Sequence, residues 1–498
     1  MATKTEGSID FAGDYDLPHV FIHTTLKEEG KRTVIDIKNL MVELNIYESI
    51  YKNALTGSIV VLDAQNLIAK LHLQGIERIS FKLKTPGLDG KRQFVDASVE
   101  TGHPFHIYKI TDRKQLSPGT NLYTIHFASR EFMRNLRTKV SQAIEGRMDM
   151  LALKIFSDTD LLDSRKELSY EKAGNSDKIV IPNMRPFDAI NMLASKTLPG
   201  KSNGVGYYFY ETTKGYHYRS WENMVSSQGT LHRKTKQNFY YMPMNITDPN
   251  IENKIQHDYQ SVESYKFVNN IHDVAANTAL GTYGHRVITH NLYDKSYNIK
   301  DYHYHNSFLE TRHTETDGTK NYAVSPNEVD HDRLGRKNVS DYPESRVSLN
   351  STTQYLHDDK EGSGYGLDVS LDGTRLGQEI AQQNQVVQGT ALKLVIKGQS
   401  YLEAGDLINF KLRSVDEKNI DGSEDPIYSG RYVITKIRHQ INATKYRMVL
   451  ECAKDAMRTS VGLNDLKIEE NSNITTFRDT YAEEAGIADY DWYTKEIF

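Results

Sequence analysis

The stretch 179–224 constrains the fold more than any other part of this chain, because it predicts three elements in a fixed order. A short apolar strand leads into Pro182, and Pro186 then opens a helix, since proline is tolerated in the first helical turn. One face of that helix is expected to be apolar through Phe187, Ile190 and Leu193. Two aromatic runs around a Lys-Gly turn, 207–210 and 216–221, then predict a hairpin. The stretch contains no catalytic motif, so its pattern indicates a structural role.

Short strands with alternating apolar and polar residues fill positions 17–130. Ile79, Phe81 and Leu83 share one face of such a strand, with polar residues between them. Clusters of Gly, Pro and Asp separate successive strands and indicate tight turns. We therefore expect a first antiparallel β-barrel or sandwich at 17–130, preceded by an arm at 1–16.

A mixed α/β domain is expected at 131–255, around the strand, helix and hairpin already described. Ser129 is a candidate N-cap for a helix of about four turns. The apolar stripe of that helix recurs every fourth residue, at Phe132, Leu136, Val140 and Ile144. A shorter helix is predicted at 150–156.

The β-strand signal returns at 256–460, where we expect a second antiparallel barrel. Its four clearest strands are predicted at 391–397, 406–412, 430–439 and 445–451. A polar insertion at about 297–372 is poor in aliphatic residues and is expected to lack a core of its own. A helix is predicted after it from Asp372, Leu376, Ile380 and Val387. The expected fold class is mainly β, with two antiparallel barrels flanking an α/β domain.

Charge is distributed unevenly along the 498 residues, whose net charge is −5. The segment 463–498 holds nine acidic and three basic residues, so the rest of the chain is close to neutral. A strong basic patch, typical of nucleic-acid-binding surfaces, is missing. The acidic arm at 461–498 also carries aromatic residues that solvated tails rarely hold, among them Tyr490, Trp492 and Tyr493. We expect this arm to dock on another surface; a disordered tail is the alternative.

The residue types needed for catalysis or metal binding form no recognisable set. Cys452 is the single cysteine, which excludes an intrachain disulfide and a cysteine-based zinc cluster. His303 and His305 have strand spacing and could reach one ion together with His290 or His313, but surface packing of Tyr and His is the alternative. The sequence has no nucleophile elbow, P-loop or HExxH motif. We therefore expect no catalytic residue, no cofactor and no metal.

Signals for secretion and membrane insertion are also missing. The first ten residues have no apolar core, and no run approaches the ~18 apolar residues of a membrane span. We expect a soluble chain, made in a cytoplasm, that does not insert into a membrane.

Four stretches, which together span most of 20–455, carry a family resemblance through the order of their hairpins and turns. They are NIYESIYKNALTGSIVVLDAQNLI with IERISFKLKTPG; IVIPNMRPFDAINMLASKT with YYFYETTKGYHYRSWENM; LGTYGHRVITHNLYDKSY; and LKLVIKGQSYLEAGDLINFKL with SGRYVITKIRHQINATKYRMVLECAKD. In these stretches the chain resembles the central baseplate hub proteins of T-even-type contractile-tailed bacteriophages. The hub part of type VI secretion spike proteins belongs to the same structural family.

The resemblance implies a homotrimeric ring in which each subunit supplies two β-barrels, giving six similar barrels. Such a hub adapts the trimeric central spike to the sixfold tail tube, and its channel passes DNA without sequence-specific binding. Implied partners are the spike protein, the tail tube and tube-initiator proteins, other baseplate proteins and the tape-measure protein. The implied location is the virion tail baseplate, after assembly in the host bacterial cytoplasm.

Aromatic residues of the hairpin and the arm are the candidate interface residues. They are Tyr208, Tyr210, Tyr216, Tyr218, Trp221, Tyr490, Trp492 and Tyr493. The hairpin residues are expected to pack either within the subunit or at the trimer seam. Three other functions stay open: a tail-associated peptidoglycan hydrolase, a carbohydrate-binding adhesin suggested by the Tyr- and His-rich 297–365 region, and the hub of a related contractile injection system.

Overall fold

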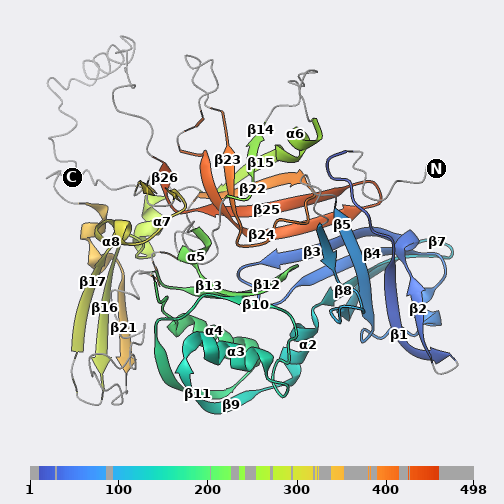
Figure 1. Ribbon diagram of the computed structural model, residues 1–498, viewed down its shortest axis with the longest axis horizontal. Helices are drawn as coiled ribbons and strands as arrows, with labels where there is room; N and C mark the ends of the chain where they lie inside the picture. The colour runs from blue at the N-terminus through green and yellow to red at the C-terminus, as the bar shows by residue number, and fades with distance from the viewer. Residues whose placement is uncertain are drawn as a thin grey trace, which may run out of the picture.

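The computed structural model describes residues 11–458 with several gaps. The gaps are 29–30, 86–92, 202–203, 226–234, 242–253, 270–272, 293–294, 296, 318–319, 322, 325–337, 353–378, 381, 383–389, 414–423 and 426. The chain is mainly β with an α/β segment, which confirms the expected fold class. Most strands join one large sheet that runs across the molecule, with the α/β segment packed below it in Figure 1. None of the described helices is long and apolar enough to cross a lipid bilayer.

The N-terminal strands form one curved, antiparallel part of this sheet, in the order β2-β1-β5-β7-β8-β4-β3, with β6 added beside β5. Its elements are β1 (Val20–Glu28), β2 (Lys31–Asp36), η1 (Lys38–Leu40), β3 (Met41–Ser49), β4 (Thr56–Asp63), α1 (Leu67–Lys70), β5 (Arg78–Thr85), β6 (Gln93–Asp96), β7 (Phe105–Ser117) and β8 (Thr120–Ala128). Ile79, Phe81 and Leu83 are buried on one face of β5, as their alternation predicts.

The C-terminal strands close into a six-stranded barrel, because each strand pairs with two neighbours around a complete cycle. The members are β14 (Asn238–Tyr241), β15 (Ser261–Asn269), β22 (Thr390–Lys397), β23 (Leu407–Lys411), β24 (Gly430–Asn442) and β25 (Tyr446–Lys454). The barrel is not wholly antiparallel, since β14 runs parallel to both β15 and β23. Parallel neighbours need a crossover connection, and α6 (Lys254–Gln260) lies between β14 and β15 in the chain.

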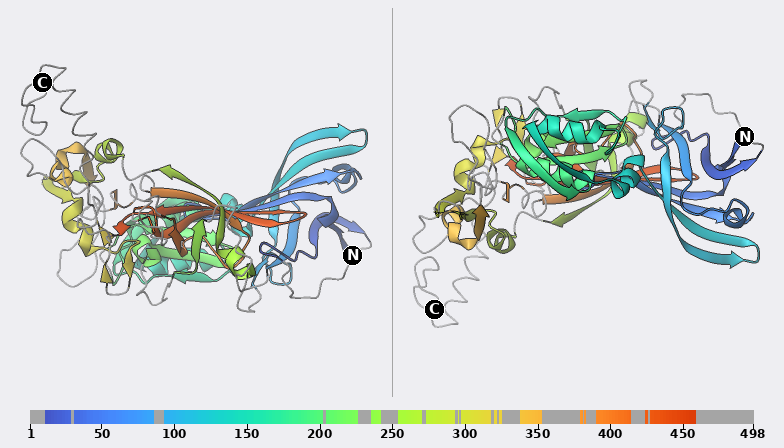
Figure 2. Two further views of the ribbon diagram at one scale, coloured as in Figure 1. Left: turned by 90° about the horizontal axis from the view of Figure 1, so that it is seen from above. Right: turned by 90° about the horizontal axis from the view of Figure 1, so that it is seen from below.

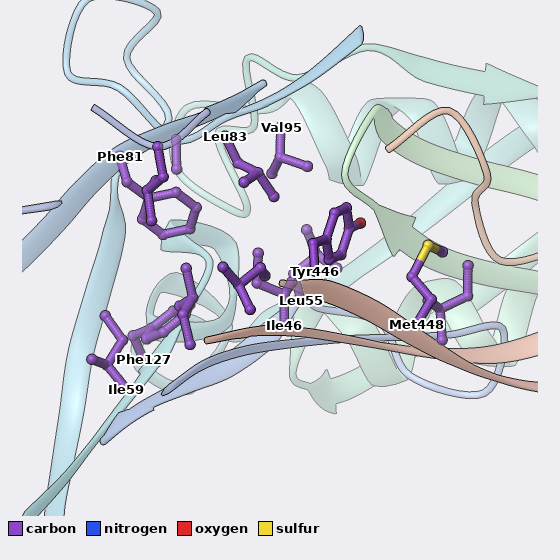
Figure 3. Packing of buried hydrophobic residues seen from close by; sticks show 14 of the residues in the cluster. Ile46, Leu55, Ile59, Phe81, Leu83, Val95, Phe127, Tyr446 and Met448 are labelled. Carbon is purple, nitrogen blue, oxygen red and sulfur yellow. The ribbon is translucent and has the colours of Figure 1, made fainter. Parts of the chain in front are cut away.

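A seam between β3 and β24 joins the N-terminal strands to the barrel. The antiparallel pairing runs from Glu43 opposite Asn442 to Ser49 opposite Lys436. A strand has two edges, and those of β3 are taken by β4 and β24, so β3 does not close the N-terminal strands into a separate barrel. One hydrophobic cluster extends across both parts. Figure 3 shows Ile46 of the first part beside Tyr446 of the second, with Phe81 and Phe127 on one side of them and Met448 on the other.

The α/β segment follows β8 and contains the opening pattern of the sequence. Its elements are α2 (Arg130–Arg137), β9 (Val140–Arg147), α3 (Met148–Ser157), β10 (Leu168–Tyr170), β11 (Ser176–Met184), α4 (Pro186–Lys196), β12 (Tyr207–Thr212), β13 (Gly215–Ser220) and α5 (Trp221–Val225). Helix α4 begins at Pro186, and Phe187, Ile190 and Leu193 are buried as predicted.

The prediction of a four-turn helix after Ser129 is wrong. Helix α2 ends at Arg137, and Val140 and Ile144 lie in β9, which pairs antiparallel with β11. A spacing of four is even, so it places both side chains on one face of a strand as well as on one face of a helix. The pairing of Ile144 with Ile179 decides between a strand and a helix. The spacing of apolar residues within one segment cannot predict that contact, because the partner lies in another segment.

The described part of the insertion forms strands and short helices beside the barrel, whereas an extended segment was expected. Its elements, with the strands around it, are α7 (Val274–Ala279), β16 (Gly284–Asn291), β17 (Tyr297–His303), α8 (Tyr304–Ser307), η2 (Phe308–Glu310), β18 (Thr316–Asp317), β19 (Lys320–Asn321), β20 (Ala323–Val324), η3 (Val339–Asp341), η4 (Pro343–Ser345), β21 (Val347–Thr352) and β26 (Met457–Arg458). Strands β17, β16 and β21 form a three-stranded sheet at the end of the molecule opposite β1 and β2 (Figures 1 and 2).

This insertion has a small aromatic core, which corrects the expectation that it has none. Tyr283, Tyr302, Tyr304 and Phe308 pack together with Ala456 from the end of the barrel. Aromatic rings supply the buried area that aliphatic residues would otherwise provide. The helix predicted around Ile380 is helical at the three positions described, 379, 380 and 382, and the rest of it lies outside the described residues. The domain limits drawn from the sequence stay predictions.

Candidate functional site

The aromatic hairpin lies between the helices of the α/β segment and the barrel. Strands β12 and β13 pair antiparallel from Tyr207 opposite Ser220 to Thr212 opposite Gly215. Gly215 has a φ of +139°, and a Cβ there would lie 2.8 Å from the carbonyl oxygen of Glu167. The turn therefore requires glycine, which explains the Lys-Gly pair in the sequence.

The two faces of the hairpin are buried against different parts of the chain. On one face, Phe209 and Tyr216 stack with ring centroids 5.3 Å apart, and Phe156 of α3 meets Tyr216 at 5.0 Å. On the other face, Tyr210 and Trp221 pack with residues of the barrel strands and the loop before β23. These contacts make the hairpin the layer that joins the α/β segment to the barrel.

This burial corrects the interface expectation for four residues. Tyr210, Tyr216, Tyr218 and Trp221 are fully buried under this chain's own atoms, so they leave no surface for a partner. Of the two arrangements that the sequence left open, packing within the subunit is the one that fits them. Tyr208 is only partly buried and makes an edge contact with the exposed Tyr51, 6.1 Å between centroids.

The other three candidate interface residues are not placed by the structure. Tyr490, Trp492 and Tyr493 lie outside the described residues. Their assignment to an interface stays a prediction from the sequence.

A largely buried lysine joins α2 to the hairpin, and its partner Glu211 extends this connection to the N-terminal strands. Lys166 forms ion pairs with Glu131 of α2, at 2.9 Å, and with Glu211 of β12. Glu211 also accepts hydrogen bonds from the Leu55 amide, at 2.8 Å, and from the Tyr216 hydroxyl, at 3.1 Å. Burial lowers the pKa of Lys166, but the two carboxylates outweigh that effect and hold the pKa above its ordinary value.

Glu48 of β3 forms a second junction, at the seam. Its carboxylate accepts hydrogen bonds from the Thr213 amide, at 3.0 Å, and the Ala404 amide, at 2.9 Å. His439 Nε2 lies 3.3 Å from Glu48, and His439 Nδ1 lies 2.6 Å from the Tyr446 hydroxyl. Burial raises the pKa of Glu48, but its bonds to His439 and the two amides outweigh burial and lower that pKa.

A neighbouring acid pair extends this junction into the loop before β23. Glu403 accepts a hydrogen bond from the Thr212 hydroxyl, at 2.8 Å, and lies 3.3 Å from His217 Nε2. Asp406 forms an ion pair with Lys236 at 2.9 Å. Burial and the charge of Glu403 raise the pKa of Asp406 to about 6 despite Lys236.

Asp455 forms a third junction, between the barrel, the hairpin and the insertion. Its carboxylate accepts hydrogen bonds from the Trp221 indole, at 3.1 Å, and from the amide and hydroxyl of Thr314, both at 2.9 Å. His313 Nδ1 lies 3.0 Å away and stacks on Phe308 with centroids 3.8 Å apart. Burial raises the pKa of Asp455, but His313 and the hydrogen bonds outweigh it and lower the pKa.

These carboxylates act as connectors between segments that are far apart in the chain. Their oxygens are occupied by amides, hydroxyls and cations of the protein itself, so they stabilise the assembly of segments. Sequence reasoning missed them, although a signal existed. Glu48 shares strand parity with Leu44 and Ile46, and His439 shares it with Ile437 and Ile441, so each polar residue sits where an inward apolar one is expected.

Metal-binding residues are not gathered within the described part of the chain, where no group of three or more His, Cys, Asp or Glu could hold an ion. His303 Nδ1 lies 2.8 Å from the Ser340 carbonyl oxygen, and His305 stacks on Tyr283. Cys452 is buried in β25, and burial raises the pKa of its thiol.

Solved structures similar to this chain are tail proteins and secretion-spike components. A tail protein from Neisseria meningitidis has 10% identity and a TM-score of 0.44, covering 89% of this chain and 97% of its own. The 43 kDa tail protein of prophage MuSo2 from Shewanella oneidensis has 9% identity and a TM-score of 0.45, covering 89% and 100%. A component of the type VI secretion system of E. coli has 7% identity and a TM-score of 0.36, covering 84% and 76%.

Comparisons with protein-family models and with curated protein sequences find no match. The structures above come from the same kinds of machinery, phage tails and type VI spikes, that the sequence resembles.

Proposed function

We propose that this chain is a structural, non-catalytic hub of a contractile phage tail. In this role it would form a homotrimer that adapts a trimeric central spike to a sixfold tail tube. The observation that carries the proposal is the β3–β24 seam, which holds two β units side by side within one chain. Three such chains around a threefold axis would present six β units, which is the match of symmetries that a hub requires.

The buried junctions support this role, because a hub must transmit force without its parts separating. Glu48, Lys166 and Asp455 each connect at least two segments through ion pairs or hydrogen bonds. Breaking a buried pair of this kind costs several kcal/mol, about 3–5. The segments are thus joined by more than apolar contact.

The charge distribution suits a channel that passes DNA. The chain has a net charge of −5 and no excess of basic residues, so it would release few counterions from DNA and bind it weakly. The proposed partners are the spike protein, the tail tube and its initiator, other baseplate proteins and the tape-measure protein. The proposed location is the tail baseplate of the virion, after assembly in the host cytoplasm.

Native mass spectrometry of the purified full-length chain tests the proposal. We expect a species of three times 56.9 kDa that appears as a ring with six lobes in negative-stain electron microscopy. The trimer should also co-purify with the spike and tail-tube proteins of the same particle when these are co-expressed with it. A chain that stays monomeric at all concentrations and retains neither protein would contradict the proposal.

A further inference from the structure

The sheet of β17, β16 and β21 has an exposed apolar patch on one face. The register places Ile288 of β16 between Ile299 of β17 and Leu349 of β21, so the three side chains form a row across the sheet. Ile299 is 49% exposed and Leu349 is 68% exposed. Tyr297 and Val347, on the same face two residues along their strands, are 71% and 50% exposed.

This arrangement differs from the isolated apolar residues that every protein surface carries. Tyr297 and Ile299 adjoin along β17, Val347 and Leu349 adjoin along β21, and the half-buried Ile288 lies between the two pairs. The Arg286–Asp301 ion pair borders this patch on the same face, and Val287, on the opposite face of β16, is fully buried. A contiguous patch of this kind indicates a contact surface.

The chain itself leads to this sheet at Arg458, the last residue that the structure describes. Strand β26 pairs with β20 of the insertion, and Ala456 packs in the aromatic core with Tyr302, which belongs to β17. Residues 459–498 therefore begin at the base of the sheet. At about 3.3 Å per extended residue, a small part of this arm is long enough to follow the seven residues of β17.

One segment of the arm has the chemistry that such a face would bind. In the sequence ADYDWY, positions 488–493, apolar and acidic residues alternate. An extended segment would place Tyr490 and Trp492 on one side and Asp489 and Asp491 on the other. Its aromatic side would cover an apolar sheet, and its acidic side would stay in water.

We propose that segment 488–493 docks on the apolar face of its own subunit's β17–β16–β21 sheet, with Tyr490 and Trp492 against Ile288, Ile299 and Leu349. Aromatic side chains bury large areas at little entropic cost, which suits a short docking segment. This inference does not depend on the hub proposal, since both the sheet and the arm belong to one chain.

Fluorescence of Trp492 tests the inference, because the chain has only two tryptophans and Trp221 is buried. The difference between the full-length chain and its W492F variant isolates the emission of Trp492. We expect that emission to be blue-shifted and poorly quenched by acrylamide. Leu349→Asp should shift it to the red and raise its quenching several-fold, because a charge would replace the most exposed member of the apolar row.

Val180→Asp is the matched control, since Val180 is 69% exposed on β11 of a different sheet. It should leave the emission of Trp492 unchanged. The inference is overturned if Leu349→Asp has no effect, if Val180→Asp has the same effect, or if Trp492 is fully quenchable in the unaltered chain. A shift that grows with protein concentration would assign the face to a second copy instead.

A disulfide trap provides a second measurement that does not depend on fluorescence. An Ile299→Cys, Tyr490→Cys double variant places one thiol on the sheet and one on the arm. The native Cys452 is buried and should not compete with them. Mild oxidation should produce an intramolecular disulfide detectable by peptide mass mapping. The Val180→Cys, Tyr490→Cys pair should not react within the subunit, and equal yields from both pairs would refute docking.

Discussion

At the scale of single residues, buried polar side chains decide how the segments of this protein meet. Asp455 shows the principle, since its carboxylate accepts four contacts from α5 and from the 313–314 segment. The carboxylate needs donors around it, and these come from two remote segments, α5 and the 313–314 part of the insertion. Such a group stabilises one arrangement of segments and disfavours the others.

Asp455→Asn should lower the free energy of unfolding by about 3 kcal/mol at neutral pH, because the amide presents N–H groups to neighbours that are themselves donors. The folded-state pKa of Asp455 lies below its ordinary value. Its contribution is therefore complete above about pH 4 and is lost as the pH falls through the folded-state pKa. Urea unfolding between pH 3 and 8 should show that the variant lacks this acid-dependent loss.

The exposed Asp16 offers a matched control for that experiment, because its contact with Lys84 is 4.0 Å long and partly solvated. Asp16→Asn should change stability by less than about 0.5 kcal/mol. An equal loss in both variants would contradict a special role for Asp455.

Tyr210→Phe should lower stability by about 2 kcal/mol without changing the oligomeric state. The Tyr210 hydroxyl accepts a hydrogen bond of 2.6 Å from Nε of the buried Arg219, and its loss leaves that donor unpaired. In the proposed trimer, Tyr208→Ser should instead weaken subunit association, because Tyr208 is the partly exposed member of the strand. Thermal unfolding and native mass spectrometry separate the two effects; dissociation caused by Tyr210→Phe alone would reverse this assignment.

At the scale of elements, backbone geometry at turns fixes where strands can pair. The hairpin turn between β12 and β13 ends at Gly215, and the turn between β7 and β8 contains Gly119, with φ values of +139° and +89°. The two turns differ in their surroundings. A Cβ at Gly215 would meet the Glu167 carbonyl at 2.8 Å, whereas a Cβ at Gly119 would meet no heavy atom within 4 Å.

Gly215→Ala should therefore cost about 3 kcal/mol, from backbone strain and from displacement of the Glu167 carbonyl. Gly119→Ala should cost about 1 kcal/mol, from strain alone. The difference in chemical denaturation midpoints isolates the close approach to Glu167. Equal costs would show that the contact with Glu167 contributes nothing.

At the scale of the whole molecule, the shared core couples the N-terminal strands to the barrel. Apolar residues on both sides of the β3–β24 seam belong to one cluster, so neither part can unfold without exposing the other. We expect calorimetry to show one cooperative transition for both parts, with equal calorimetric and van't Hoff enthalpies. Glu48→Ala should lower the temperature of that transition without dividing it. Two separated transitions in the unaltered protein would contradict this coupling.

Local signals in the sequence were sufficient for many elements. The alternation around Phe81 predicted β5, and the proline at 186 predicted the start of α4, because each depends on neighbouring residues alone. The helix predicted through Val140 and Ile144 failed where a strand partner 35 residues away decided the outcome. The aromatic hairpin was predicted as an element, but the burial of Tyr216 and Tyr218 within the subunit followed only from packing.

By itself, the sequence determined the mainly β class, four of the six strands of the barrel and the glycine turn of the hairpin, since periodicity and backbone sterics act over a few residues. Tertiary structure alone decided that β24 pairs with β3, that β14 runs parallel to its neighbours, and that Glu48 and Asp455 meet donors from remote segments. Most of these outcomes depend on contacts between residues more than a hundred positions apart. No local pattern encodes them, because each strand edge and each buried carboxylate accepts any partner of suitable geometry that the rest of the fold brings to it.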